Sequence, residues 1–180
     1  MKSFNSKNKI SKSLEVKVKR VKMVFTDVDG VLTDGGRYYN ETGEILKKFH
    51  VRDGMGINIL LRNGIKTIIV TKEKSKIVQK WASDVNVYKV YFNSIKKEET
   101  LDEISKKMRI SLDQIAYIGD DVNDIEISKK VGFSAMPKDA SILLKPVIDY
   151  VCKSNGGEGA FREIVDLIML TKFPKDQKLY

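Results

Sequence analysis

The chain has 180 residues, a length that suits one domain with a full hydrophobic core rather than two. Its formal charge of +9 could indicate a nucleic-acid partner, but most of that charge lies at one end. Residues 1–22 carry eight Lys or Arg and one Glu (8 − 1 = +7), which leaves 25 − 23 = +2 for the remainder. This distribution argues against a nucleic-acid-binding surface on the folded domain, and we expect no nucleic-acid partner.

The basic segment at residues 1–20 is the first feature in chain order. Serine and asparagine separate its charges, which predicts a solvated, partly disordered tail; an arm that binds a partner or a polyanion is the alternative. The segment lacks the apolar run of a secretory signal, and no window approaches the length of a membrane span. Cys152 is the only cysteine, so no internal disulfide is expected. We expect a soluble, cytoplasmic protein without a membrane partner.

An apolar run at residues 21–26 predicts a short buried strand, and the sequence D-V-D-G follows it directly. Asp27 and Asp29 therefore lie where the chain leaves that strand. In open α/β sheets, ligand sites lie outside the carboxyl ends of the strands. Two acids held together there repel each other, so we expect a divalent cation, a shared proton or a lysine beside them. A pair that only caps a helix or a turn is the simpler alternative.

The next segment, residues 36–50, has two strand-like arms around Asn-Glu-Thr-Gly, which predicts a β-hairpin. An isolated hairpin is marginally stable in water, so we expect this one to pack against something.

Strand-like and helical segments alternate through the rest of the chain. The predicted strands are 66–71, 85–92, 114–118 and 133–136, and the predicted helices are 54–62, 74–82, 95–108, 124–131 and 159–170. This alternation is typical of a parallel sheet covered on both faces. We predict an α/β fold, a Rossmann-like doubly wound parallel sheet with a β-hairpin flap after the first strand and no large cap. The domain is expected to span 21–172, with a C-terminal tail at 173–180.

Polar groups follow several of the predicted strands. Thr71 ends the second strand, Lys97 begins the helix after the third, and the sequence G-D-D-V-N-D with Asp120 follows the fourth. Because these ends open on the same side of a doubly wound sheet, we expect them to form one cluster. Carboxylates, a hydroxyl and an ammonium around Mg²⁺ suit phosphoryl transfer, with Asp27 as nucleophile and Asp29 as general acid and base.

The motifs D-V-D-G-V-L-T-D, the strand-terminal Thr, the Lys and G-D-D-x-x-D together resemble the haloacid dehalogenase superfamily of phosphatases. The resemblance implies an aspartyl-phosphate formed on Asp27 and acid/base chemistry by Asp29. It implies that Thr71 and Lys97 bind phosphate. The implied Mg²⁺ ligands are Asp27, Asp29 through its carbonyl, and Asp120, with Asp121 and Asp124 supporting them. Asp121 is equally well explained as a helix cap.

The hairpin, residues 49–57 and residues 155–163 resemble one capless branch of this superfamily. That branch contains the 3-deoxy-octulosonate 8-phosphate phosphatases and relatives that act on nine-carbon sialic-type acid 9-phosphates. The resemblance implies a small phosphorylated sugar acid as substrate and a homotetramer in which a neighbour's C-terminal region closes the active site. The residues implied in substrate binding are His50, Arg52, Asp53, Gly54, Glu73 and Arg162.

The sequence leaves the identity of the sugar open. Glu73, in T-K-E-K, is closer to the nine-carbon branch, whereas Arg52 and Asp53, in V-R-D-G, are closer to the eight-carbon branch. Asn58 and Trp81 appear where the family carries basic residues. His50 could instead be an ordinary hairpin residue.

Two other protein classes deserve comparison. A phospho-acceptor receiver domain also combines acids, a hydroxyl, a lysine and Mg²⁺, but its phosphorylated Asp would end a later strand, where this chain has Asn93. A non-catalytic oligomerisation or regulatory module of the same fold, associated with a sugar-acid cytidylyltransferase, is the alternative to an enzyme.

Overall fold

The computed structural model of the protein describes residues 10–175 and residue 178. Within these residues, a parallel six-stranded sheet has the spatial order β5-β4-β1-β6-β7-β8. The strands are β1 (Met23–Thr26), β4 (Lys66–Val70), β5 (Lys89–Tyr91), β6 (Ile115–Ile118), β7 (Phe133–Met136) and β8 (Tyr150–Val151). The chain builds the sheet outward from β1 first on one side and then on the other. The switch point, where α/β proteins bind ligands, therefore lies beside β1.

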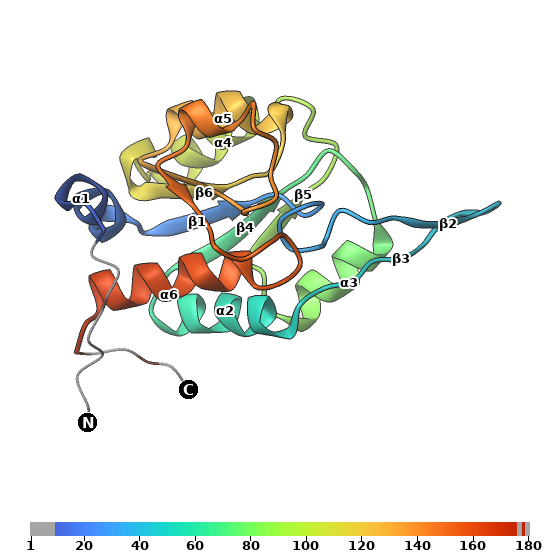
Figure 1. Cartoon of the computed structure of the whole chain (residues 1–180), viewed down its shortest axis with the longest axis horizontal. Helices are drawn as coiled ribbons and strands as arrows, with labels where there is room; N and C mark the ends of the chain where they lie inside the picture. Colours follow the sequence, from blue (N-terminus) through green and yellow to red (C-terminus); the bar gives the residue numbers. More distant parts are fainter. Residues whose placement is uncertain (1–9, 176–177, 179–180) are drawn as a thin grey trace.

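Helices cover both faces of this sheet (Figure 1). One face carries α2 (Val51–Arg62), α3 (Lys76–Asp84) and α6 (Ala160–Lys172), and the other carries α4 (Lys97–Met108) and α5 (Ile125–Lys130). The prediction of a doubly wound α/β fold is confirmed. The two-residue strand β8 was not predicted, because a strand of that length leaves no periodic pattern in the sequence.

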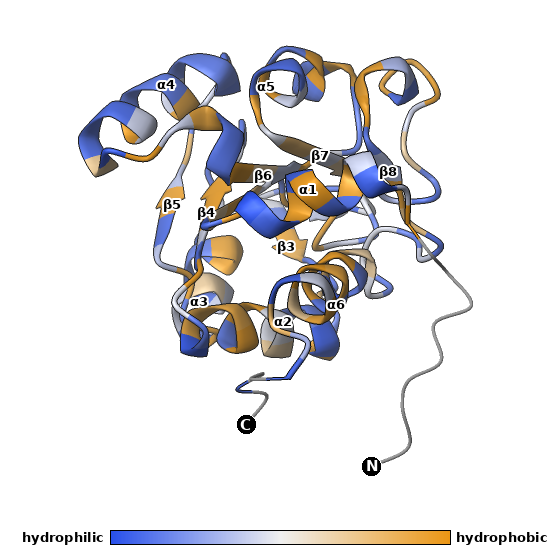
Figure 2. Ribbon diagram, turned by 90° about the vertical axis from the view of Figure 1, so that its left-hand side faces the viewer, coloured by the Kyte–Doolittle hydropathy of each residue, from blue (hydrophilic) through white to orange (hydrophobic). Residues whose placement is uncertain are grey.

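Two hydrophobic cores follow from the alternation of side chains along the strands. In β1, Val24 belongs to the core under α2 and α6, whereas Phe25 belongs to the core under α4. All four residues of β1 are buried, as expected for the central strand of a parallel sheet. Figure 2 shows hydrophobic residues in the strands and on α6 below them.

The register of β1 with its neighbours sets the position of the first acid. Thr26, the last residue of β1, pairs with Ile69 of β4 and with Ile118 of β6. Asp27 therefore emerges where β6 ends and one residue before Thr71 leaves β4, which brings the three predicted strand ends to one edge of the sheet.

The predicted hairpin is present, as β2 (Tyr38–Asn40) and β3 (Gly43–Leu46). It projects away from the body of the domain (Figure 1), and none of the residues that the structure describes forms a larger cap. Four large hydrophobic side chains on it, Tyr38, Tyr39, Ile45 and Leu46, are 48–60% exposed. The hairpin therefore presents an apolar surface that the described part of the chain does not cover.

The segment predicted as a solvated tail contains a helix, α1 (Lys12–Arg20), and that prediction is wrong for these residues. Ser11 caps the helix, Val18 is fully buried, and α1 packs against α6. Lysines separate the apolar residues of this helix, so its composition does not predict that Val18 is buried against the domain. Residues 1–9 lie outside the described part of the chain.

In the described ranges, no helix combines the length and apolar character needed to cross a membrane. The last helix ends at Lys172, where the sequence predicts the end of the domain.

Candidate active site

The loop after β1 carries Asp27 and Asp29 in a tight turn. The carbonyl of Val28 accepts hydrogen bonds from three following backbone N–H groups at 2.9–3.2 Å. Gly30 has a φ of +81°, and a Cβ on it would lie only 2.0 Å from Oδ2 of Asp120. Glycine at this position therefore lets the β1 loop close against the acid that follows β6.

A segment from the end of the chain closes on the same turn. A Cβ on Gly156 would lie 1.9 Å from the carbonyl oxygen of Gly30, and the N–H of Gly157 donates to the carbonyl of Val31 at 2.9 Å. These two glycines bring their backbone directly against the loop that carries the acids.

Asp27 is 6% exposed and forms the centre of a buried charge cluster. Its Oδ2 pairs with Nζ of Lys97 at 2.6 Å, and its Oδ1 accepts from the N–H of Val28 at 2.7 Å. Lys97 makes a second ion pair at 2.6 Å, with Oδ1 of Asp124. Burial alone would lower the pKa of Lys97, but Asp27 and Asp124 raise it above its ordinary value. Lys97 therefore remains an ammonium although it has no exposed surface.

Asp124 is fully buried, and both of its carboxylate oxygens have partners in the chain. Oδ1 accepts from Lys97 and from the hydroxyl of Tyr117, and Oδ2 accepts from the N–H of Asp120 at 2.8 Å and of Asp121 at 3.4 Å. Asp124 thus shapes the loop after β6 and aligns Lys97, which fits the supporting role predicted for it.

Three carboxylates share this region with one ammonium. Asp27, Asp120 and Asp124 each offer an oxygen within 4.8 Å of the other two. Burial, followed by repulsion from Asp27 and Asp124, raises the pKa of Asp120 to about 8. Burial also raises the pKa of Asp27 to about 6, against the opposing effect of Lys97. This uncompensated negative charge and the all-oxygen donor set fit a divalent cation such as Mg²⁺.

The sequence left open whether Asp121 caps a helix or belongs to the site, and the structure is compatible with both. Its side chain caps the short 3₁₀ helix Val122–Asp124 through the N–H of Val122 at 2.8 Å. It also lines the pocket described below.

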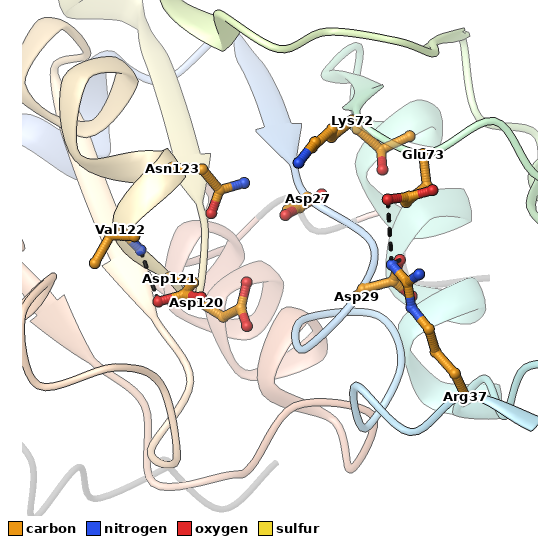
Figure 3. A pocket seen from close by; sticks show the side chains of 10 residues that line it. Asp27, Asp29, Arg37, Lys72, Glu73, Asp120, Asp121, Val122 and Asn123 are labelled. Carbon is orange, nitrogen blue, oxygen red and sulfur yellow. Dashed lines mark hydrogen bonds and ion pairs between the residues drawn. The ribbon is translucent and has the colours of Figure 1, made fainter.

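Asp29 faces a different set of groups, all contributed by the β1 loop and the hairpin side. Its Oδ1 accepts from the ammonium of Lys47 and from the hydroxyl of Thr33, the latter at 3.4 Å. Its Oδ2 lies 3.6 Å from Nη2 of Arg37, which also pairs with Glu73 at 3.5 Å. Figure 3 shows Arg37 reaching Asp29 and Glu73 from the hairpin side of the pocket.

These groups surround a pocket of about 360 Å³. It is lined by Asp27, Asp29, Arg37, Thr71, Lys72, Glu73, Asp120, Asp121, Val122 and Asn123 (Figure 3). Six of the predicted site residues therefore meet in one cavity. Lys97 is not part of the lining and reaches this cavity through its contact with Asp27.

Thr71 is 3% exposed and is held by its own backbone. Its N–H donates to the carbonyl of Tyr91 at 3.0 Å, and its carbonyl accepts from the N–H of Ser94 at 3.1 Å. Two backbone hydrogen bonds therefore fix the main chain of Thr71 at the wall of the pocket.

The other predicted substrate residues lie outside this pocket. Arg52 and Arg162 line a second cavity of about 330 Å³ together with Ser154, Glu158, Gly159, Glu163 and Asp166. Arg162 is paired with Asp166 at 2.7 Å. Because the role predicted for Arg162 involves a neighbouring subunit, it stays a prediction.

His50, Asp53 and Gly54 have structural contacts in this chain. His50 is the N-cap of α2, where its Nδ1 accepts from the N–H of Arg52 at 3.3 Å. A Cβ on Gly54 would lie 2.8 Å from a methyl group of Val85, so this glycine allows α2 to pack closely. The substrate contacts predicted for the three residues remain predictions.

Asp53 joins the two helices on this face of the sheet. It is fully buried, and its Oδ1 accepts from the N–H of Arg162 at 2.8 Å, in the first turn of α6. The N-cap residue of α6 is Gly159, which has no side chain to offer, so Asp53 of α2 supplies the capping carboxylate instead.

Four residues of this site were not predicted from the sequence: Arg37, Lys47, Lys72 and Asn123. Lys72 lies between the predicted Thr71 and Glu73, and Asn123 lies inside the G-D-D-V-N-D motif, so proximity in sequence was an available signal for both. Arg37 and Lys47 reach Asp29 only because of the way the hairpin leaves the domain, which no local sequence pattern specifies.

Comparison with known proteins places these observations in a family. The model of the haloacid dehalogenase-like hydrolases matches residues 63–164. The 3-deoxy-D-manno-octulosonate 8-phosphate phosphatase of Haemophilus influenzae is 37% identical over 156 residues, 87% of each chain. The corresponding enzyme of Escherichia coli K12 is 36% identical over 168 residues, which cover 93% of this chain and 89% of that one.

Solved structures agree with this result. The phosphatase of the same name from Yersinia pestis has a TM-score of 0.88 at 34% identity, and the match covers 91% of this chain and 88% of that one. The Moraxella catarrhalis phosphatase, solved with a magnesium ion, a phosphate ion and a KDO molecule, has a TM-score of 0.87 at 32% identity, over 91% and 94% of the two chains.

Proposed function

The chain belongs to the haloacid dehalogenase-like hydrolases, and on that basis we propose that it is a Mg²⁺-dependent phosphatase of 3-deoxy-D-manno-octulosonate 8-phosphate. The observation that carries the proposal is the buried cluster of Asp27, Lys97 and Asp124 with Asp120 at its edge. Relatives named for this reaction match the chain over nearly its whole length, which supports the same substrate here.

Asp27 and Asp120 are the carboxylates proposed to hold Mg²⁺, together with the backbone carbonyl of Asp29. Both carboxylates line the pocket, and their raised pKa values reflect a negative charge that a divalent cation would neutralise. When bound, the ion supplies positive charge for the phosphate oxygens. Asp124 and Asp121 hold the loop that presents Asp120.

Asp27 is proposed as the nucleophile. One of its carboxylate oxygens forms a bond to phosphorus while the bond from phosphorus to the sugar oxygen breaks, which leaves an aspartyl-phosphate. Lys97 binds the other oxygen of this carboxylate and keeps its orientation. The hydroxyl of Thr71, a residue that lines the pocket, is proposed to hold a phosphate oxygen.

Asp29 is proposed as the general acid and base. It gives a proton to the sugar oxygen as that group leaves, and it then takes a proton from the water that hydrolyses the aspartyl-phosphate. The separate surroundings of the two acids support this division of roles, because Asp27 contacts a lysine in the core and Asp29 contacts cations from the hairpin side.

The sugar is proposed to occupy the side of the pocket formed by Arg37, Lys72 and Glu73. Two cationic side chains there suit a substrate that carries a carboxylate in addition to its phosphate, and Glu73 can accept hydrogen bonds from sugar hydroxyls. These groups do not distinguish an eight-carbon from a nine-carbon acid, so the eight-carbon substrate rests on the relatives.

A homotetramer with shared active sites is proposed as the working assembly. The exposed apolar side chains of the hairpin support it, because a projecting two-stranded ribbon needs a partner surface for stability. Arg52 and Arg162, in the second cavity, would then face a neighbour's substrate. Mass measurement in solution tests this, and a stable monomer with full activity would contradict it.

The function is tested by measuring phosphate release from three compounds: octulosonate 8-phosphate, a nine-carbon 3-deoxy-2-keto acid 9-phosphate and an aldose phosphate without a carboxylate. We expect kcat/KM to be at least about tenfold higher for the first, and we expect chelation of Mg²⁺ to abolish release. Preference for the nine-carbon acid would contradict the proposed substrate but not the proposed phosphatase activity. No release from any compound, with Mg²⁺ present, would favour the non-catalytic module.

A further inference from the structure

Lys47 is a buried ammonium for which the proposed reaction, as described above, has no role. It follows β3 directly, and its side chain has no exposed surface. Moving an ammonium from water into a protein interior is unfavourable unless anions compensate it. The chain provides two, Asp29 and Glu44, the latter at 2.8 Å.

The two carboxylates connect Lys47 to both sides of the pocket. Glu44 also accepts a hydrogen bond from the hydroxyl of Ser75 at 2.8 Å, and Ser75 caps α3, just after Glu73. A continuous line of contacts therefore runs from Asp29 through Lys47 and Glu44 to Ser75. The loop between β4 and α3 and the hairpin are therefore tied together through Lys47, which also contacts Asp29.

The contacts of Asp29 differ between its two oxygens. Oδ1 is occupied by the ammonium of Lys47 and by the hydroxyl of Thr33, whereas Oδ2 contacts, among the residues that the structure describes, only Arg37, at 3.6 Å. A carboxyl group with one oxygen held in this way cannot rotate freely. Oδ2 is thus the oxygen left to meet a ligand in the pocket.

We propose that Lys47 is a positioning residue that holds Oδ1 of Asp29 and so directs Oδ2 at the bridging oxygen of the substrate. The proposal rests on the proposed function, in which Asp29 is the general acid. In the first step, the bond between phosphorus and the sugar oxygen breaks as the bond to Asp27 forms. The proton on Oδ2 of Asp29 passes to the departing sugar oxygen. Lys47 keeps its own protons throughout and donates a hydrogen bond to Oδ1.

This role has a signature that simple structural support lacks. A sugar alkoxide is a poor leaving group and needs the proton, whereas a nitrophenolate leaves without one. kcat/KM reports only the steps up to the first irreversible one, which is transfer of the phosphoryl group to Asp27. Loss of Lys47 should therefore lower kcat/KM for a sugar-acid phosphate much more than for p-nitrophenyl phosphate.

The test compares Lys47→Met with the matched control Lys48→Met. Lys48 is the next residue, with a side chain 52% exposed and paired with Asp34. For Lys47→Met we expect kcat/KM with octulosonate 8-phosphate to fall by about 10²-fold or more, the range of general acid catalysis. We expect the value with p-nitrophenyl phosphate to change by less than about threefold. Lys48→Met should leave both values within about twofold of the wild type.

A second variant distinguishes the proposed role from a loss of folding. Lys47→Met leaves Glu44 without its ammonium, so Lys47→Met with Glu44→Gln removes that charge as well. Thermal unfolding of both variants shows whether the domain is intact. The double variant should show the same selective loss.

An equal loss with both substrates, or no loss with either, would overturn the role of Lys47 and leave the phosphatase intact. A wild-type protein that hydrolyses neither compound would overturn the proposed function and this inference with it.

Discussion

The two acids of the D-V-D-G motif are two residues apart but belong to regions of different character. The core side consists of Asp27, Lys97, Asp124 and Tyr117, all buried between the sheet and α4. The hairpin side consists of Asp29, Arg37, Glu44 and Lys47, where Arg37 is 37% exposed and only Lys47 is fully covered.

The difference suggests how one motif supports two chemical roles. The proposed nucleophile, Asp27, follows β1, whose four residues are all buried in the core. The proposed acid, Asp29, is held by side chains from a hairpin that projects from the domain and has exposed apolar residues. We therefore expect changes to the hairpin to alter protonation and substrate fit without disturbing Asp27. Substitutions on the two sides should therefore have separable effects on activity and stability.

Asp27→Asn should abolish turnover and leave the protein folded. An amide has no charged oxygen to attack phosphorus, and we expect kcat to fall by about 10⁴-fold or more, measured as phosphate release. Because Asp27 loses a negative charge in a region with excess acid, unfolding temperature should not fall sharply. Substantial remaining activity would contradict the role of Asp27 as nucleophile.

Lys97→Met should destabilise the core side. It leaves Asp27 and Asp124 buried without the ammonium that pairs with both of them. Breaking a buried ion pair in this way costs about 3–5 kcal/mol of unfolding free energy. Denaturant titration measures the loss. The control is Lys96→Met, since Lys96 pairs with Glu99 on the surface and its loss should change stability far less than the loss of Lys97.

Asp53→Asn tests a buried acid without an ammonium, because Asp53 is buried like Asp27 but accepts from the backbone N–H of Arg162. Burial raises its pKa to about 6, above its ordinary value of 3.8. Protonated Asp53 therefore stabilises the folded state below about pH 4, and this contribution disappears as pH rises through about 6.

The Asn variant lacks this titration. Wild-type stability should thus fall relative to the variant by about 1–3 kcal/mol between pH 4 and 7. Denaturant titration of both proteins at several pH values measures the difference. A difference that stays constant with pH would contradict this prediction, because it would show that the pKa of Asp53 is the same in the folded and unfolded states.

Arg37→Ala should have the smallest effect, confined to the hairpin side. It removes a partly exposed cation from the pocket, so KM for a sugar-acid phosphate should rise by about three- to tenfold, with less change for p-nitrophenyl phosphate. Unfolding temperature should not change measurably. An equal rise in KM for both substrates would indicate that Arg37 binds the phosphate and not the sugar acid.

The sequence was sufficient to predict the location of site residues that directly follow a buried strand. Asp27, Thr71 and Asp120 each follow a buried strand, and the order of parallel strands brings such ends together. Lys97 was identified by its place in the motif order, but its full burial was not, because burial depends on how α4 packs onto Tyr117.

The sequence does not determine a residue's role where one residue type is common in two kinds of position. His50 and Asp53 are typical both of substrate contacts and of helix caps, and in this chain both act as caps. Lys47 is one of two adjacent lysines, and only the fold shows that it is buried while Lys48 is exposed. The composition of residues 12–20 indicates disorder, but these residues form α1, in which Val18 is buried among lysines.

The contact of Gly156 and Gly157 with the β1 loop bears on synthesis of the protein at the ribosome. The proposed nucleophile is made early, at residue 27, but the backbone that closes on its loop comes from residues near 157. A nascent chain that ends before Gly157 lacks the hydrogen bond to Val31, and one that ends before β6 lacks a neighbour of β1. We therefore expect the catalytic loop to acquire its shape only when most of the chain has emerged, so that partly made chains bind no phosphate.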